Sequence, residues 1–298
     1  MKVGFVSAIL DGWEFSEVIE IAKSQGYGCV EVACWPSGPA KRRYAGVSHL
    51  DVASLTDGKA AEINGLLAES GVSISSLGFY PNPLDPIGGP AAVEHLHKVI
   101  DASALLGVNL VTTFIGRDQR LTVDENLKLV REVWPAILTH AADKGVKVGI
   151  ENCPMLFGVE QWPGGQNLFT TPAIWAKVFD MLDSSALGLN YDPSHFAWQM
   201  MDPIKPIYDF AEKLLHVHIK DIHVDPYKLD QVGIMAYPLE YMSPKLPGHG
   251  DIDWGKFASA LNDVEYNGPV CVEVEDRAYE GSRERILKSL ELSKRYIE

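Results

Sequence analysis

Three ionisable side chains recur at every second position between residues 214 and 221, a stretch that reads Leu-Leu-His-Val-His-Ile-Lys-Asp. In an extended strand successive side chains point to opposite faces, so His216, His218 and Lys220 share one face and apolar residues occupy the other. An unpaired polar group that is buried in a protein costs about 1–3 kcal/mol. A strand that aligns three such groups therefore predicts a face that looks into a site of polar chemistry.

Three other β-rich runs of the chain carry acids at or near their carboxyl ends. Along each run apolar side chains alternate with the acids, which places Glu151, Asp192 and Glu273 on the inner face together with His218. Carboxylates that crowd together do not stay ionised without a cation to neutralise them. The sequence therefore predicts a divalent metal site with Glu151, Asp192, His218 and Glu273 as ligands. Glu275 shares the inner face with Glu273 and is the alternative ligand.

The donor set indicates which metal the site prefers. Three oxygen donors and one imidazole suit Mn²⁺ best, with Mg²⁺, Co²⁺, Fe²⁺ and Zn²⁺ as further candidates. Because no cysteine belongs to the set, a structural zinc site is disfavoured. His218 is preferred to His216 because it lies nearer the carboxyl end of its strand. The expected cofactor is thus a divalent metal ion, with Mn²⁺ as the first choice.

These side chains need a scaffold that brings the ends of several strands together. Eight β-rich runs alternate with eight helical patterns, which predicts a single (β/α)8 TIM barrel of the α/β class, formed as one domain over residues 1–298. The expected strands are 3–9, 29–35, 74–80, 110–116, 147–152, 187–192, 214–221 and 269–275. The expected helices are 14–25, 57–70, 90–106, 123–144, 172–182, 203–213, 254–264 and 281–297.

In such a barrel the loops after the strands form the active face. Three of these loops are long, namely residues 36–56, which include the basic run Lys41-Arg42-Arg43, residues 153–171 and residues 222–253. Long loops with aromatic residues inside a compact domain are usually functional. We expect them to roof a cavity above the metal site.

Four residues near the strand ends are predicted to bind substrate. His195 follows Asp192 by three residues, and Lys220 continues the inner face of its strand. Trp13 and Trp162 fall in or beside the loops of the active face, and aromatic rings pack well on sugar rings.

Charge and composition restrict the partner and the compartment. The chain has 40 acidic and 26 basic residues and a net charge of −14, which disfavours nucleic acid and anionic membranes as partners. No apolar run approaches the roughly 18 residues of a membrane span, and nothing marks the chain for export. The four cysteines have no metal or disulfide spacing. We expect a cytoplasmic protein that acts on a small molecule.

In five motifs the chain resembles the xylose isomerase-like barrel superfamily of sugar phosphate isomerases and epimerases. The resemblance covers essentially the whole chain. It implies metal ligation by the four residues predicted above, with His195 near the substrate and with Glu151 and Glu273 serving also as acid and base. A homo-oligomer is compatible with it. The motifs are Ile150-Glu151-Asn152, Asn190-Tyr191-Asp192-Pro193-Ser194-His195, the strand from His216 to Asp221, Pro247-Gly248-His249-Gly250-Asp251-Ile252-Asp253-Trp254, and Val272-Glu273-Val274-Glu275-Asp276.

The expected function is that of a divalent-metal-dependent isomerase or epimerase of a keto sugar or polyol derivative. Glu151 and Glu273 would act from opposite sides of the substrate, through proton abstraction and a metal-bound enediolate. The alternative is a lyase that uses the same enolisation to expel a β-substituent from a keto-glycoside or inosose.

Two further alternatives are weaker. The abasic-site nucleases of this superfamily need extra histidines after strands 3 and 4, where this chain has Gly78-Phe79-Tyr80-Pro81 and Phe114-Ile115-Gly116-Arg117. A non-catalytic sugar-binding barrel would retain ligand affinity when Glu151 is replaced by Gln.

Overall fold

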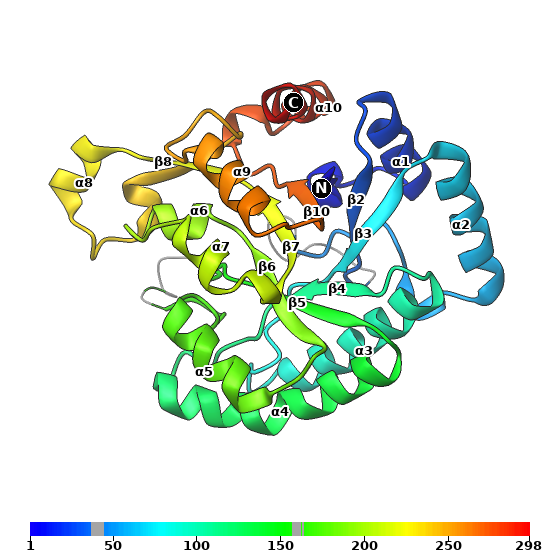
Figure 1. Ribbon diagram of the computed structural model, residues 1–298, viewed down its shortest axis with the longest axis horizontal. Coiled ribbons are helices and arrows are strands. Elements are labelled where there is room, and N and C mark those ends of the chain that lie inside the picture. The colour runs from blue at the N-terminus through cyan, green and yellow to red at the C-terminus, as the bar shows by residue number, and fades with distance from the viewer. Residues whose placement is uncertain (37–44, 157–161, 163) are drawn as a thin grey trace.

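The computed structural model describes residues 1–36, 45–156, 162 and 164–298 of the chain. In this part of the chain eight parallel strands close into a barrel, in the order β1-β10-β7-β6-β5-β4-β3-β2 (Figure 1). The strands are β1 (Lys2–Val6), β2 (Cys29–Ala33), β3 (Ser73–Gly78), β4 (Leu110–Thr113), β5 (Lys147–Glu151), β6 (Leu187–Tyr191), β7 (Leu214–Ile219) and β10 (Pro269–Val272).

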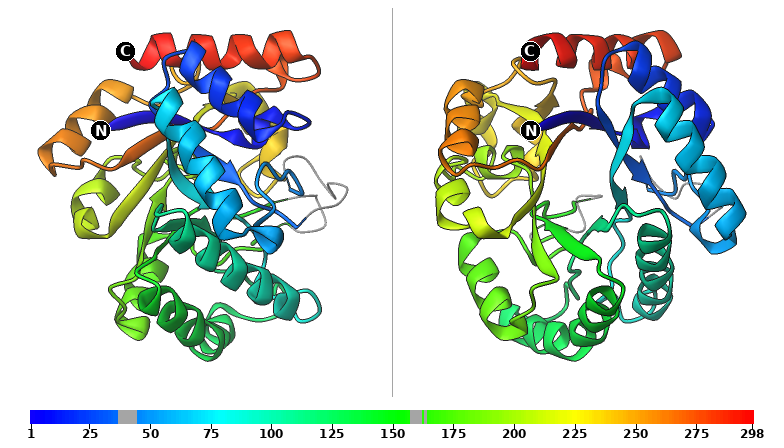
Figure 2. Two further views of the ribbon diagram at one scale, coloured as in Figure 1. Left: turned by 90° about the vertical axis from the view of Figure 1, so that its right-hand side faces the viewer. Right: turned by 45° about the vertical axis from the view of Figure 1, so that its right-hand side comes forward.

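Helices surround this barrel on the outside, so the predicted (β/α)8 barrel is confirmed (Figure 2). The side chains of Thr56, Thr122 and Thr171 cap the amino ends of three helices by accepting a backbone N–H, as threonine does well at this position. The outer helices are α1 (Phe15–Ser24), α2 (Asp57–Ser70), α3 (Gly89–Leu105), α4 (Val123–Asp143), α5 (Pro172–Leu182), α7 (Lys205–Asp209), α9 (Trp254–Asp263) and α10 (Arg283–Ile297).

Most of the predicted strands are too long at their carboxyl ends. The fourth, for example, was expected to reach Gly116, but β4 ends at Thr113. Beyond it the backbone N–H groups of Ile115 and Gly116 donate to the side-chain carbonyl of Asn167, at 3.1 and 3.4 Å. The chain therefore leaves the ladder at the rim, where loop side chains replace the neighbouring strand as hydrogen-bond partners.

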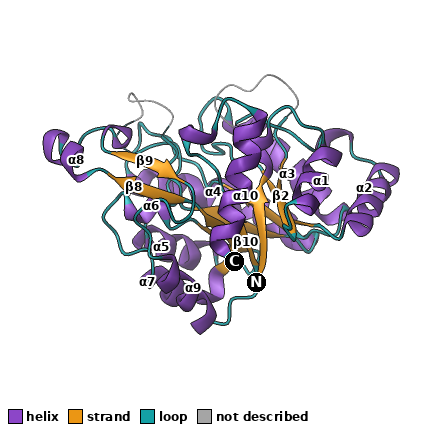
Figure 3. Cartoon of the chain, turned by 90° about the horizontal axis from the view of Figure 1, so that it is seen from above, coloured by secondary structure: helices purple, strands orange, loops and turns teal. Residues whose placement is uncertain are grey.

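The region after β7 holds structure that the sequence pattern did not predict. Where one long loop was expected, β8 (Asp221–Val224) pairs antiparallel with β9 (Met242–Lys245), and α8 (Pro226–Val232) lies in the connection beyond the outer end of this ladder (Figure 3). A short helix, α6 (Ser194–Ala197), also follows β6. Both additions lie directly after strands that carry predicted site residues.

The apolar core fills the space between the barrel and its helices. Trp175 of α5 is fully buried, and its ring lies 5.2–6.0 Å from the rings of Phe169, Tyr191, Phe196 and Phe210. Its indole N–H donates to the carbonyl of Phe169 at 2.9 Å. None of the helices in the described part of the chain has both the length and the apolar character needed to cross a membrane.

Trp175→Ala is expected to lower the free energy of unfolding by about 3–5 kcal/mol, because it removes a large buried ring and leaves a cavity. Denaturant unfolding of the purified variant measures this loss. Tyr208→Ala, at a side chain that is 48% exposed, is the control and should cost far less. Equal losses in the two variants would contradict the packing role of Trp175.

Candidate active site

The four predicted metal ligands meet at the carboxyl end of the barrel. Glu151, Asp192, His218 and Glu273 each offer one ligand atom, and these atoms all lie within 4.8 Å of one another. Glu151 ends β5, Asp192 and Glu273 directly follow β6 and β10, and His218 lies on β7. Because these four strands are neighbours around the barrel, their inward side chains share one space. The Nδ1 atom of His218 lies 3.7 Å from Glu151 Oε1 and 3.5 Å from Glu273 Oε2.

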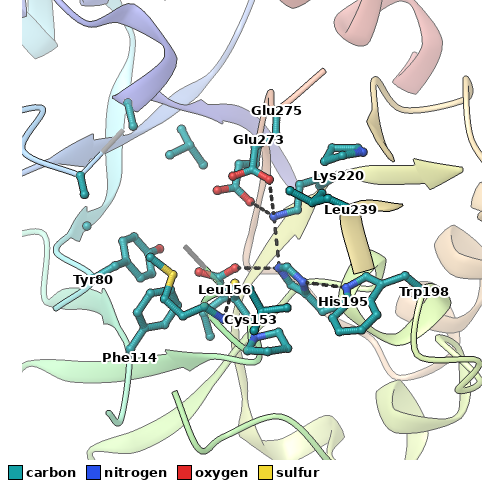
Figure 4. A pocket seen from close by; sticks show the side chains of 18 of the residues that line it. Tyr80, Phe114, Cys153, Leu156, His195, Trp198, Lys220, Leu239, Glu273 and Glu275 are labelled. Atoms are coloured by element: carbon teal, nitrogen blue, oxygen red, sulfur yellow. Dashed lines mark hydrogen bonds and ion pairs between the residues drawn. The ribbon is translucent and has the colours of Figure 1, made fainter. Parts of the chain in front are cut away.

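The ammonium group of Lys220 lies among these carboxylates (Figure 4). It is 2.6 Å from Glu273, 2.9 Å from Asp192 and 3.6 Å from Glu275. Burial lowers the pKa of Lys220, but the surrounding carboxylates outweigh burial and hold its pKa well above the usual range. Burial conversely raises the pKa of Glu273, and the Lys220 charge outweighs this effect, so that the net pKa of Glu273 is about 2. The ammonium group of Lys220 and the carboxylates of Asp192 and Glu273 therefore form a network of opposite charges at the carboxyl end of the barrel.

His195 of α6 borders the same network. Its Nε2 atom lies 3.2 Å from both Asp192 Oδ2 and Lys220 Nζ, and 3.6 Å from Glu151 Oε1. The indole N–H of Trp198 donates to its Nδ1 atom at 3.4 Å. The structure thus brings together His195 and Lys220, two of the four predicted substrate-binding residues.

A cavity of about 320 Å³ opens above these groups, within the roughly 300–1,000 Å³ typical of small-molecule sites. Its polar floor contains Glu151, His195, Lys220, Glu273 and Glu275. Its walls are largely apolar and aromatic, and include Trp35, Tyr80, Phe114, Leu156, Trp198, Tyr237, Leu239 and Met242.

The two predicted tryptophans do not belong to the described lining of this cavity. The ring of Trp13 packs under the guanidinium group of Arg283, at 4.3 Å. The indole N–H of Trp162 donates to the carbonyl of Met235 at 2.9 Å, and its ring lies 6.4 Å from Trp198. The basic run Lys41-Arg42-Arg43 lies outside the described residues.

Glu31 of β2 is a site residue that the sequence analysis missed. It is fully buried, and its carboxylate contacts the Nε2 atom of His218 at 3.0 Å, while the hydroxyls of Tyr80 and Ser76 donate to it at 2.5 and 3.1 Å. Burial raises the pKa of Glu31, but the charge and hydrogen bond of His218 outweigh burial and lower its pKa overall. The pKa of His218 is raised in turn, since Glu31 more than offsets burial. The sequence could have identified Glu31 as an inward-facing residue, because it stands between two valines in the alternating pattern of β2.

Asp221 holds the next loop against the end of β7. Its carboxylate accepts the backbone N–H groups of Gly248 and Gly250, at 2.9 and 3.1 Å, and the indole N–H of Trp254 at 2.8 Å. A Cβ atom at Gly250 would lie 2.3 Å from this carboxylate, so only glycine fits there. These contacts explain the spacing of the motif from Pro247 to Trp254.

The chain belongs to the xylose isomerase-like TIM barrel family, whose sequence pattern matches residues 19–296. The protein YfiH of Bacillus subtilis, described as uncharacterised, is 25% identical to it over 299 residues, which cover 93% of each chain. An inosose dehydratase of Clostridium tetani is 31% identical over 113 residues, which cover 37% of this chain and 38% of that enzyme.

Solved structures share the barrel. A D-psicose 3-epimerase, determined in the presence of D-fructose, superimposes with a TM-score of 0.72 over 99% of this chain and 98% of that chain, at 15% identity. The IOLI protein with a zinc atom superimposes with a TM-score of 0.72 over 100% of this chain and 98% of that chain, at 18% identity. At these identities the likeness shows a common fold.

Lys220→Met is expected to lower the free energy of unfolding by about 3–5 kcal/mol in the presence of a chelator, because it leaves buried carboxylates without their cation. Denaturant unfolding at neutral pH measures the loss. Lys228→Met is the matched control, since Lys228 is 60% exposed and pairs with Asp225 at the surface at 3.7 Å. A Lys220 variant as stable as the parent would show that the network is not ionised as described.

Proposed function

We propose that this protein is a divalent-metal-dependent isomerase or epimerase of a keto sugar or polyol derivative. The observation that carries the proposal is the cluster of Glu151, Asp192, His218 and Glu273, of which Glu151 and Glu273 line the floor of a cavity of ligand size. A small carbohydrate is the proposed substrate, and the sugar epimerases among the solved structures of the same fold support this class.

The residues of the cluster fit a metal ion. The Nδ1 atom of His218 and the Oδ2 atom of Asp192 are buried and make no hydrogen bond to any described residue. Asp192 Oδ2 lies within ion-pair distance of Lys220, but without hydrogen-bond geometry. Buried polar atoms normally have a hydrogen-bond partner, so two atoms without one in the same cluster fit the binding of a cation. Three carboxylates and one imidazole suit Mn²⁺ first among the divalent metals.

A divalent ion held by these four residues would polarise a substrate carbonyl and acidify the neighbouring C–H bond. The carboxylate of Glu151 would receive the proton, and the approach of Glu151 and Glu273 to His218 Nδ1 from two different strands supports this assignment. Glu273 would then return a proton from the other side, after taking it from the ammonium group of Lys220, which lies 2.6 Å away. This step would invert the carbon or, at the next carbon, isomerise the sugar. His195 can donate a hydrogen bond to a substrate oxygen through its Nε2 atom, which faces the cavity floor.

A lyase is the second candidate. The likeness to inosose dehydratases supports it, although the matched segment covers about a third of the chain. The first proton transfer at Glu151 would be unchanged, and the leaving group would depart from the neighbouring carbon.

Incubation of the Mn²⁺-loaded protein in D₂O with keto sugars and inososes separates the two candidates. We expect deuterium to enter a substrate whose carbon skeleton and substituents are retained, as NMR and mass spectrometry would record. Glu151→Gln and Glu273→Gln should each lower the exchange rate about 10²- to 10⁴-fold, because each removes a proton-transfer group. Glu284→Gln, at an exposed position of α10, is the control.

Deuterium entry with loss of water or another substituent would select the lyase. Absence of exchange with every substrate would contradict both enzymes and favour a non-catalytic sugar-binding barrel.

Metal binding has a stability readout of its own. At a hundredfold excess of free Mn²⁺ over Kd, the free energy of unfolding should rise by about 2.7 kcal/mol, and a chelator should reverse the gain. Asp192→Asn should weaken the effect, because it removes an anionic ligand. Asp118→Asn, at a buried carboxylate paired with Arg120 elsewhere, should retain it. A parent protein with the same unfolding curve with and without metal would contradict the metal site.

A further inference from the structure

We propose that Glu31 is a positioning residue that holds His218 in the tautomer and orientation needed for metal binding. The inference rests on the proposed metal site. Glu31 contacts the Nε2 atom of His218, which is the ring nitrogen not proposed to bind the metal. Glu31 is fully buried and lies on β2, which β1 separates from the strands of the proposed ligands on one side and β3 and β4 on the other. A buried carboxylate in a barrel interior is costly unless it is paired, so its partners indicate its role.

The contact with His218 defines where the imidazole proton lies. The Nε2 atom of His218 is 3.0 Å from Glu31 Oε2, and an ionised carboxylate can only accept. Nε2 must therefore carry a proton, which leaves Nδ1 as the atom available for a metal. Nδ1 is the buried atom of the ring without a hydrogen bond to any described residue, and it faces Glu151 and Glu273. A histidine ligand is commonly oriented by a carboxylate in this way.

Asn190 also lies close to the Nε2 atom of His218, and its contacts allow Nε2 to carry the proton. Its side-chain nitrogen is 3.1 Å from Nε2 of His218 and also 3.1 Å from the hydroxyl of Tyr80. Since an amide N–H cannot accept, it donates to Tyr80 instead. The Tyr80 hydroxyl in turn donates to Glu31 Oε1 at 2.5 Å, so both carboxylate oxygens are engaged.

The surroundings of Glu31 fit one position of its carboxylate. The hydroxyl of Ser76 donates to Oε2 at 3.1 Å. Gly78 of β3 lies against the other oxygen, and a Cβ atom there would come within 2.7 Å of Glu31 Oε1 and 3.3 Å of its Cδ atom. Because glycine has no Cβ atom, the carboxylate of Glu31 can occupy this space. Two variants can thus disturb the contact with His218. Glu31→Gln removes the negative charge, and Gly78→Ala displaces the carboxylate.

The test measures Co²⁺ binding to the chelator-treated full chain, by visible absorption and by competition with Zn²⁺. Glu31→Gln and Gly78→Ala are each expected to weaken metal binding about 10- to 100-fold, the range found when carboxylates that orient metal-bound histidines are removed. Asp118→Asn is the control for loss of a buried carboxylate elsewhere. Gly65→Ala is the control for the added methyl group, since nothing lies within 4 Å of a Cβ atom there. Both controls should bind Co²⁺ as the parent does.

A second readout separates positioning from general stability. In ¹⁵N-histidine-labelled parent protein above the titration range of His218, long-range NMR correlations should show the proton on Nε2. In the two variants the Nδ1–H tautomer should appear as well. Circular dichroism verifies that each variant is folded, and Gly78→Ala, which removes no polar group, decides the question if Glu31→Gln does not fold.

The outcomes distinguish this inference from the proposed function. Variants that bind Co²⁺ as tightly as the parent, with an unchanged tautomer, would overturn the role of Glu31 and leave the metal site intact. A parent protein that binds neither Co²⁺ nor Zn²⁺ would overturn both.

Discussion

The balance of charge at the carboxyl end of the barrel is the constraint on which the site depends. The buried carboxylates of Glu31, Glu151 and Asp192 and the partly buried one of Glu273 lie around Lys220 and His218. Buried charges interact strongly, so each side chain must lie where its partners are. The strands supply this precision, because every one of these groups is on a barrel strand or on the residue next to one. The excess of negative charge also explains why the cluster suits a divalent cation.

Much of this arrangement could be predicted from period-2 alternation. Four strands that end with an inward acid or histidine identified Glu151, Asp192, His218 and Glu273, because the closed barrel leaves inward side chains a common interior. The same alternation marks Glu31 on β2, which was missed because the inward faces of only β5, β6, β7 and β10 were compared. The barrel joins its first and last strands, so β2 faces β7 across the interior although the two are far apart in sequence. That closure is a property of the whole fold, which no local pattern contains.

The loops could not be predicted to the same degree. Trp13 and Trp162 were chosen for their positions near strand ends, but a loop side chain can turn toward the rim or away from it, and local sequence does not decide which. Trp13 packs on Arg283, a contact with the opposite end of the chain. The cavity receives Tyr237 and Leu239 from the segment between β8 and β9 instead. The barrel strands thus determine the polar floor, and the segments beyond them determine the shape of the walls.

The way in which Asp221 fastens its loop has a consequence for how such an enzyme can diverge. The ladder between β8 and β9 brings the two ends of the segment from residue 225 to residue 241 together, and Asp221 secures the chain that follows. That segment is therefore a module with fixed points of attachment. Insertions, deletions or grafts within it can remodel the outer wall of the cavity while the side chains on β7 keep their places. New specificity can arise in this fold without any change to the polar floor of the cavity.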